Sequence, residues 1–164
     1  MANAQWTQLG PGAGGQERAV YVYNNTATSK YDFYVGSDVS GVWRASSVDP
    51  LLLDDATQYD WQYISNNGIV RFINKFVPAE NASFHKLLVA YRNGIGTIDL
   101  GGNTGMTNLW SQEDSWVSDI FVSTMSGNSA NIYFITGTTR IKDEPGNFKN
   151  NATTKDLYMA TLSL

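Results

Sequence analysis

A pattern of three short strands recurs three times along this chain, at a spacing of about 50 residues. A tryptophan accompanies each copy: Trp6, Trp61 and Trp110. Repeats of this length, built from short alternating strands, are typical of β-propeller blades. A single blade cannot bury its own two faces, so the copies must stack against one another. This repeat constrains the fold more than any other feature of the chain.

Each copy contains runs rich in β-branched and aromatic residues, bounded by Gly, Asn and Ser. The predicted strands are residues 18–23, 32–36 and 41–45, then 70–76, 86–91 and 96–100, then 118–124, 131–135 and 156–162. Trp61 and Trp110 lie in short runs that we interpret as fourth, outer strands. No long window has a helical period. We therefore predict an all-β fold with about three four-stranded antiparallel blades, at residues 6–64, 65–111 and 112–164.

Three blades do not close a ring, because propellers typically have about four to eight. The third copy has no fourth strand after it, and the run 6–9 has no copy before it. Two explanations follow. The chain is the N-terminal part of a longer propeller, which we favour, or two copies assemble into one ring with six blades.

The composition excludes several function classes. The formal charge of −4 leaves no basic stripe that could neutralise the phosphates of a nucleic acid. Without cysteine, neither disulfides nor thiolate metal sites can form. No apolar run approaches the roughly 18 residues of a membrane span. No cofactor is predicted: the acid pairs Asp54-Asp55 and Asp143-Glu144 could bind calcium, but neither has the alternating spacing of a calcium loop.

The N-terminus has the small-x-small form of a signal-peptidase site, Ala2-Asn3-Ala4 before Gln5. We therefore interpret residues 1–5 as the remainder of an export signal. An exported protein would be secreted or held at the cell surface.

Residues 6–15, Trp-Thr-Gln-Leu-Gly-Pro-Gly-Ala-Gly-Gly, and residues 34–44, Tyr-Val-Gly-Ser-Asp-Val-Ser-Gly-Val-Trp-Arg, resemble the first blade of a large propeller group. That group includes sortilin-like proteins, BNR (Asp-box) proteins and glycoside hydrolases of family 74. Ser40 departs from the pattern, because a glycine is usual there. Ser47-Val48-Asp49 followed by Trp61 resembles an expanded Asp box, which is a structural hairpin. The resemblance implies a bacterial exported propeller.

The same resemblance places Asp38 where family 74 has its catalytic base. An inverting glycosidase needs a second carboxyl group about 6.5–9.5 Å away, and in that family it comes from another propeller. The alternative is a turn aspartate that hydrogen-bonds the nearby backbone.

In a propeller, the turns between second and third strands share a rim with the connections between blades. The candidate ligand-binding residues on that rim are Asn66, Arg92, Asn93, Asp114, Trp116 and Arg140. Trp116 could stack on a sugar ring or anchor a peptide, or it could pack between blades. We expect Arg18 and Arg92 to be solvated or paired with carboxylates. The single histidine, His85, is expected at the surface on the opposite side from Asp38.

These observations favour an exported β-propeller that acts as a binding or display scaffold for a glycan or a protein at the cell surface. One alternative is a fragment of a glycoside hydrolase acting on a β-glucan such as xyloglucan. Another is a subunit of a surface assembly that recruits partners through unpaired strand edges.

Overall fold

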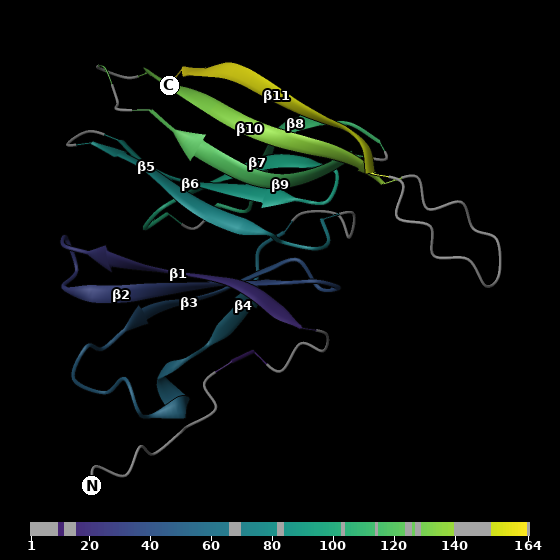
Figure 1. Ribbon diagram of the computed structural model, residues 1–164. Coiled ribbons are helices and arrows are strands. Elements are labelled where there is room, and N and C mark those ends of the chain that lie inside the picture. The colour runs from purple at the N-terminus through teal and green to yellow at the C-terminus, as the bar shows by residue number, and fades with distance from the viewer. Residues whose placement is uncertain are drawn as a thin grey trace, which may run out of the picture.

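The computed structural model describes residues 10–11, 16–65, 70–81, 84–102, 104–113, 115–123, 126, 129–139 and 152–163. These residues form three antiparallel sheets and one short 3-10 helix, Ala56–Gln58 (Figure 1). The predicted all-β class is confirmed. Residues 1–9, including Trp6 and the interpreted signal remnant, lie outside the described residues.

The sheets follow one another along the chain. Sheet 1 contains β1 (Glu17–Asn25), β2 (Lys30–Ser37), β3 (Val42–Val48) and β4 (Trp61–Tyr63). Sheet 2 contains β5 (Lys75–Asn81), β6 (Phe84–Tyr91), β7 (Gly94–Asp99) and β8 (Thr107–Ser111). Sheet 3 contains β9 (Ser115–Val122), β10 (Ser129–Thr139) and β11 (Ala152–Ser163). Each strand pairs with the next one in sequence, so each sheet is a meander.

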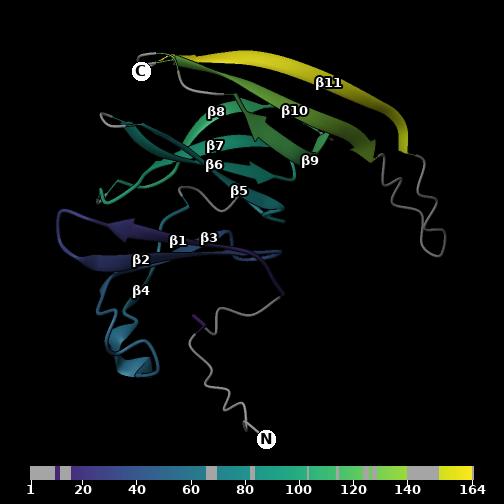
Figure 2. The ribbon, with the colours of Figure 1, turned by 60° about the vertical axis from the view of Figure 1, so that its left-hand side comes forward.

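Sheet 2 lies between the other two sheets, as both ribbon views show (Figures 1 and 2). Its run Leu87, Leu88, Val89, Ala90 and Tyr91 is buried throughout. Alternate side chains of a strand point to opposite faces. Leu87, Val89 and Tyr91 therefore belong to a core cluster shared with sheet 1, and Leu88 and Ala90 belong to a second cluster shared with sheet 3. This strand has no polar alternation because both of its faces are covered.

The first strands of the three sheets lie next to one another: β1 contacts β5, and β5 contacts β9. The later strands of each sheet extend away from that line of contacts. The connections between sheets enter β5 and β9 at the same end of the molecule as the start of β1. The candidate site lies at this end.

The predicted strand 70–76 is wrong for residues 70–74. β5 begins only at Lys75. Phe72 has a φ angle of 54°, in the left-handed region that a β-strand does not contain. Residues 70–74 form the connection from sheet 1 to sheet 2 instead.

An ion pair joins the first strands of sheets 2 and 3, between Lys75 Nζ and Asp119 Oδ1. The hydrogen bond from Lys75 holds the pKa of the Asp119 carboxyl below its ordinary value of 3.8. A carboxyl with a lowered native pKa stabilises the fold above its unfolded pKa, and this contribution is lost as the pH falls through the native pKa.

We expect Asp119→Asn to lower the free energy of unfolding by no more than about 0.5 kcal/mol at pH 7, because exposed ion pairs are weak. The two side chains are 45% and 56% exposed. Urea unfolding of the parent and the variant measures the difference, which should shrink toward zero near pH 2 as the parent carboxyl becomes protonated. A difference that is the same at both pH values would contradict this role of the ion pair.

Candidate functional site

Residues 71–74, in the connection between β4 and β5, are hydrogen-bonded to all three sheets. The backbone bonds run from Phe72 N to Asp38 O at 2.9 Å, from Ile73 N to Ser37 O at 3.1 Å, from Asn74 N to Ala90 O at 2.8 Å, and from Arg92 N to Arg71 O at 3.1 Å. The Asn74 side chain adds a bond from Nδ2 to Val117 O of β9, at 2.7 Å. The connection is therefore held at a point where sheets 1, 2 and 3 meet.

This anchoring sets the position of the Phe72 ring. The left-handed backbone at Phe72 is costly for a bulky residue and persists only where its surroundings fix it. Here the hydrogen bonds on both sides of the residue supply that restraint. The half-buried ring consequently lies among side chains from β1, β9 and the β6–β7 turn.

Phe72 is the centre of an arginine–aromatic cluster formed by Arg18, Phe72, Arg92 and Trp116. The Phe72 and Trp116 ring centroids are 5.4 Å apart, with planes inclined by 47°. The guanidinium carbon of Arg18 lies 6.0 Å from the Phe72 centroid and 5.9 Å from the Trp116 ring. That of Arg92 lies 5.7 Å from the Phe72 centroid. All three distances are within the range of about 6 Å for cation–π attraction.

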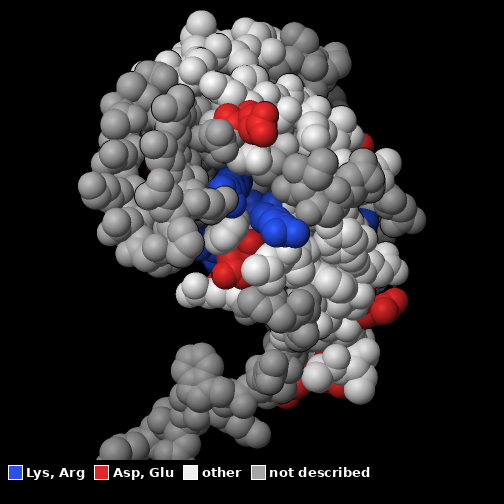
Figure 3. Space-filling view, turned by 90° about the vertical axis from the view of Figure 1, so that its right-hand side faces the viewer, with Lys and Arg blue, Asp and Glu red and all other residues white. Residues whose placement is uncertain are grey.

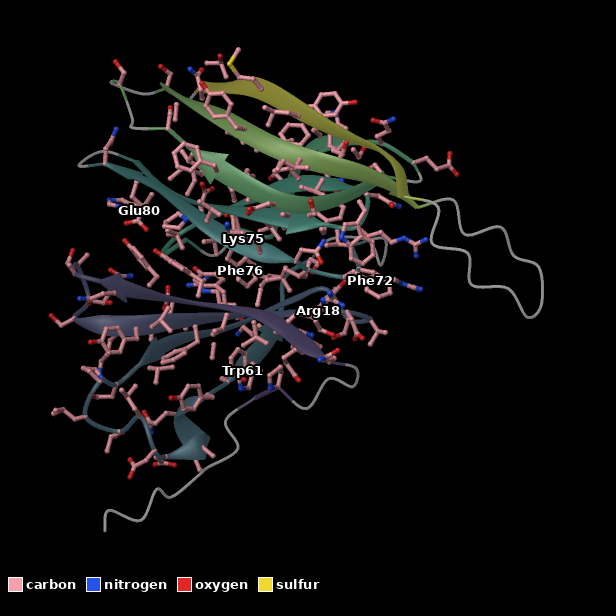
Figure 4. All side chains as sticks on the ribbon, viewed as in Figure 1. Arg18, Trp61, Phe72, Lys75, Phe76 and Glu80 are labelled. Carbon is pink, nitrogen blue, oxygen red and sulfur yellow. The ribbon has the colours of Figure 1, made fainter. Side chains whose placement is uncertain are left out.

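The cluster is open to solvent at the end of the strands. Arg18 and the neighbouring Arg71 are exposed, whereas Phe72, Arg92 and Trp116 are half-buried. Figure 4 labels Arg18 and Phe72 at this end, and Figure 3 looks onto it, with Lys and Arg side chains gathered near the centre and Asp and Glu on either side.

The arginines of the cluster are not neutralised by the part of the chain that the structure describes. The ion pairs between described residues use Lys30, Arg44, Lys75, His85 and Lys86, and none uses Arg18, Arg71 or Arg92. Of the two expectations for Arg18 and Arg92, pairing with carboxylates is not found among those residues, whereas Arg18 is exposed to solvent and Arg92 is half-buried. The chain has a net charge of −4, so the three arginines make this end of the molecule locally more positive than the rest.

A guanidinium that stacks on an aromatic ring keeps its N–H edge free to donate. That edge matches the geometry of a carboxylate, and two parallel hydrogen bonds can form. The ring also restricts the arginine, which lowers the entropy cost of binding. The chemistry of this cluster therefore suits an anionic group.

Asp38 lies in the turn between β2 and β3, beside the cluster. Its Oδ1 accepts a hydrogen bond from Gln16 N at 2.8 Å, and its own N–H donates to Gln16 O at 3.0 Å. Its carbonyl accepts the bond from Phe72 N. These contacts give Asp38 a structural part in holding the chain before β1 and the connection at Phe72. A catalytic part for Asp38 stays a prediction.

The structure brings two other predicted residues to the same end. Trp116, the second residue of β9, contacts Phe72 from the next sheet and is half-buried, so it both packs between sheets and retains an accessible part. Asn93 forms the two-residue β6–β7 turn with Arg92. Its Oδ1 is buried and accepts no hydrogen bond from a described residue. Asn66, Asp114 and Arg140 lie outside the described residues.

His85 lies at the opposite end, as predicted, where Figure 4 labels its partner Glu80. Its Nδ1 is 3.8 Å from Glu80 Oε2, and Tyr21 donates a hydrogen bond to Glu80 Oε1 at 2.7 Å. Burial is the main cause that raises the pKa of the Tyr21 hydroxyl, so Tyr21 remains a donor at neutral pH.

Asp55, considered above for calcium, has another role. Its Oδ1 accepts from Thr57 N at 2.9 Å and caps the 3-10 helix. Asp54 is exposed next to it, and Asp143 and Glu144 lie outside the described residues. In the described ranges, no three His, Asp or Glu side chains gather as metal ligands, and no helix is long and apolar enough to span a membrane.

Phe72 is the residue that sequence reasoning missed. It looked like an inward residue of a strand, and a left-handed phenylalanine has no sequence signal of its own. The only hint was that Arg71 and Phe72 follow the turn-type segment Asn66-Asn67-Gly68 after only two intervening residues. A comparison with protein-family models, curated proteins and solved structures finds no match to this chain.

Proposed function

We propose that this chain is an exported β-propeller-type binding scaffold and that its arginine–aromatic cluster holds a carboxylate-bearing glycan or peptide at the cell surface. The observation that carries the proposal is the pair of guanidinium groups, Arg18 and Arg92, that lie within cation–π distance of the Phe72 ring and form no ion pair with a described carboxylate.

The propeller architecture rests on the repeat. Three meanders follow in sequence, two of them with four strands, and their first strands lie side by side. Loops at one end of such sheets converge, which is the arrangement in which propellers bind their ligands. The resemblance to Asp-box and sortilin-like propellers and the Ala2-Asn3-Ala4 motif support an exported protein.

Isothermal titration with three probes tests the proposal. The probes are hexagalacturonic acid as the acidic glycan, hexaglutamate as the acidic peptide, and a neutral xyloglucan oligosaccharide. We expect at least one acidic probe to bind, with an affinity that falls as salt is raised. We expect no binding of the neutral probe at this cluster.

Arg92→Ala should weaken binding of the acidic probe by about tenfold or more, since hydrogen bonds to charged groups contribute about 1.5–3 kcal/mol. Arg92→Lys keeps the charge but loses the planar fork, and should recover only part of the affinity. The matched control is Lys30→Ala, which removes one positive charge at the other end of sheet 1 and should leave binding unchanged. Equal losses in Arg92→Ala and Lys30→Ala would mean that net charge alone attracts the probe. Absence of binding to both acidic probes would overturn the proposal.

A further inference from the structure

In the part of the chain that the structure describes, no element covers the outer face of sheet 3, which is largely apolar. Tyr133 of β10 lies opposite Phe121 of β9 and Met159 of β11, and Ile135 lies opposite Asp119 of β9 and Leu157 of β11. Phe121, Leu157 and Met159 are 63%, 71% and 64% exposed. The neighbouring residues in sequence, such as Ile120 and Phe134, point the other way into the core with sheet 2. The apolar surface therefore crosses all three strands.

Sheet 1 has a second face of this kind on its side away from sheet 2. One row of opposed residues there is Val20, Val35, Trp43 and Tyr63, and the next row is Val22, Phe33, Ala45 and Trp61. Neither row contains a charged residue. Tyr59 covers part of the second row, with its ring 5.2 Å from that of Phe33. The part on β1 remains open, and Val20 is 67% exposed.

These two faces lie at opposite ends of the stack of sheets, as both ribbon views show (Figures 1 and 2). Within the chain, sheet 1 packs one face on sheet 2, and sheet 2 packs its far face on sheet 3. The free face of sheet 3 is the one that would continue this series, and the free face of sheet 1 is the one that would precede it. The free face of sheet 3 is therefore suited to pack on a free face of sheet 1.

We propose that a second copy of this chain covers both faces, with sheet 3 of each copy packed on sheet 1 of the other. The contact is head-to-tail, and a two-fold axis closes it after two copies because each copy supplies both faces. The result is a closed set of six sheets, within the usual range for propellers.

The size of the faces fits a stable dimer. Strands about 4.8 Å apart with a rise of about 3.3 Å per residue make a three-stranded face of roughly 14 by 26 Å. Four fully open faces of this size would bury about 1,500 Å² in the dimer, a standard size for a specific interface. The part of each sheet 1 face that Tyr59 already covers reduces this area. The two rows of sheet 1 carry no charge, and the one charged residue opposite Ile135 on sheet 3, Asp119, is already paired with Lys75, so association should depend little on salt.

Sedimentation equilibrium and light scattering of the full chain, from about 0.1 to 100 µM, test the proposal. This concentration range covers micromolar and submicromolar dissociation constants, which interfaces of this size can have. We expect a species of twice the mass of one 18.1 kDa chain. A folded chain that stays monomeric throughout would overturn the proposal, and would point instead to a further sheet of the same polypeptide or a different protein on these faces.

Two variants identify the faces. Leu157→Lys on sheet 3 and Val20→Lys on sheet 1 should each weaken self-association by about 30-fold or more, the effect of losing a central interface side chain. Both side chains are exposed, so the fold should survive, as near-UV circular dichroism can verify. The matched control is Val39→Lys, in the β2–β3 turn outside both faces, and it should associate like the parent.

Mixing the two weakened variants separates this arrangement from any other dimer. A mixed pair retains one intact contact, between the parent sheet 3 of the Val20→Lys chain and the parent sheet 1 of the Leu157→Lys chain. Because one lysine already breaks a contact, a second lysine in the same contact costs little more, so we expect the mixture to associate more strongly than either variant alone. A dimer through sheet 3 alone would be insensitive to Val20→Lys, and that result would overturn the head-to-tail contact.

Discussion

Replacing Asp32 by alanine is expected to lower the free energy of unfolding by about 3–5 kcal/mol, because it leaves a buried arginine without its counterion. Asp32 Oδ2 lies 3.1 Å from Arg44 Nη2, and the two side chains are only 3% and 7% exposed. The other carboxylate oxygen, Oδ1, accepts from Ser47 N at 2.8 Å, where the backbone has a φ angle of 60°. Arg44 also donates to Gly102 O, in the β7–β8 connection of sheet 2. The loss would therefore affect both sheet 1 and its contact with sheet 2.

Urea unfolding followed by tryptophan fluorescence measures this loss. The matched control is Asp49→Ala, which removes an aspartate from the more exposed pair with Lys30 and should cost far less. The double variant Asp32→Ala/Arg44→Met removes both charges and should regain part of the stability, since an apolar pair of similar volume is tolerated better than one buried charge. If Asp32→Ala cost no more than Asp49→Ala, the buried ion pair would not be a main stabilising contact of sheet 1.

Replacing Gly36 by alanine is expected to lower the free energy of unfolding by about 3 kcal/mol, at the upper end of typical overpacking effects. Gly36 is buried in β2, where a Cβ atom would lie 2.4 Å from Cγ2 and 2.5 Å from Cβ of Ile73. Ile73 is itself fully buried and its backbone is bonded to Ser37 O, so it cannot move away easily. Sheet 1 and the connection would have to separate to accept the methyl group.

The chain contains a matched control for this substitution. Gly137, in β10, has no atom within 4 Å of the position of an added Cβ. Gly137→Ala should therefore leave stability unchanged or raise it slightly, because alanine restricts the unfolded chain. Thermal and urea unfolding of the two variants under the same conditions give the comparison. Equal stabilities would show that Gly36 is not required for close packing against Ile73.

The sequence predicted the sheets well because the residues within each strand and its turns are enough to indicate it. Strands such as residues 32–36, 86–91 and 131–135 carry β-branched and aromatic side chains between turn residues, and all three are found as β2, β6 and β10. The repeated spacing also predicted three successive meanders. The uninterrupted apolar run at residues 87–91 lies in the middle sheet, where both of its faces are covered.

The arginine–aromatic cluster could not be predicted in the same way, because contacts between residues far apart in the sequence form it. Residues 70–74 have the composition of a strand, but tertiary hydrogen bonds to Ser37, Asp38 and Ala90 hold them out of the sheets. Trp116 and Arg92 could be assigned to one end of the molecule from topology alone. Their meeting with Arg18 could not, because it depends on the backbone angle at Phe72. For the same reason, the sequence pointed to Asp38 and not to the aromatic ring beside it.

The connection at residues 71–74 has a consequence for how the molecule comes apart. Proteins built from repeats can often lose one unit while the others persist. Here four residues are hydrogen-bonded to all three sheets, so no sheet can open without breaking bonds to that connection. We therefore expect the three meanders to unfold as a single cooperative unit. A ligand held at Phe72 would protect the whole unit from local opening, including strands that it never touches.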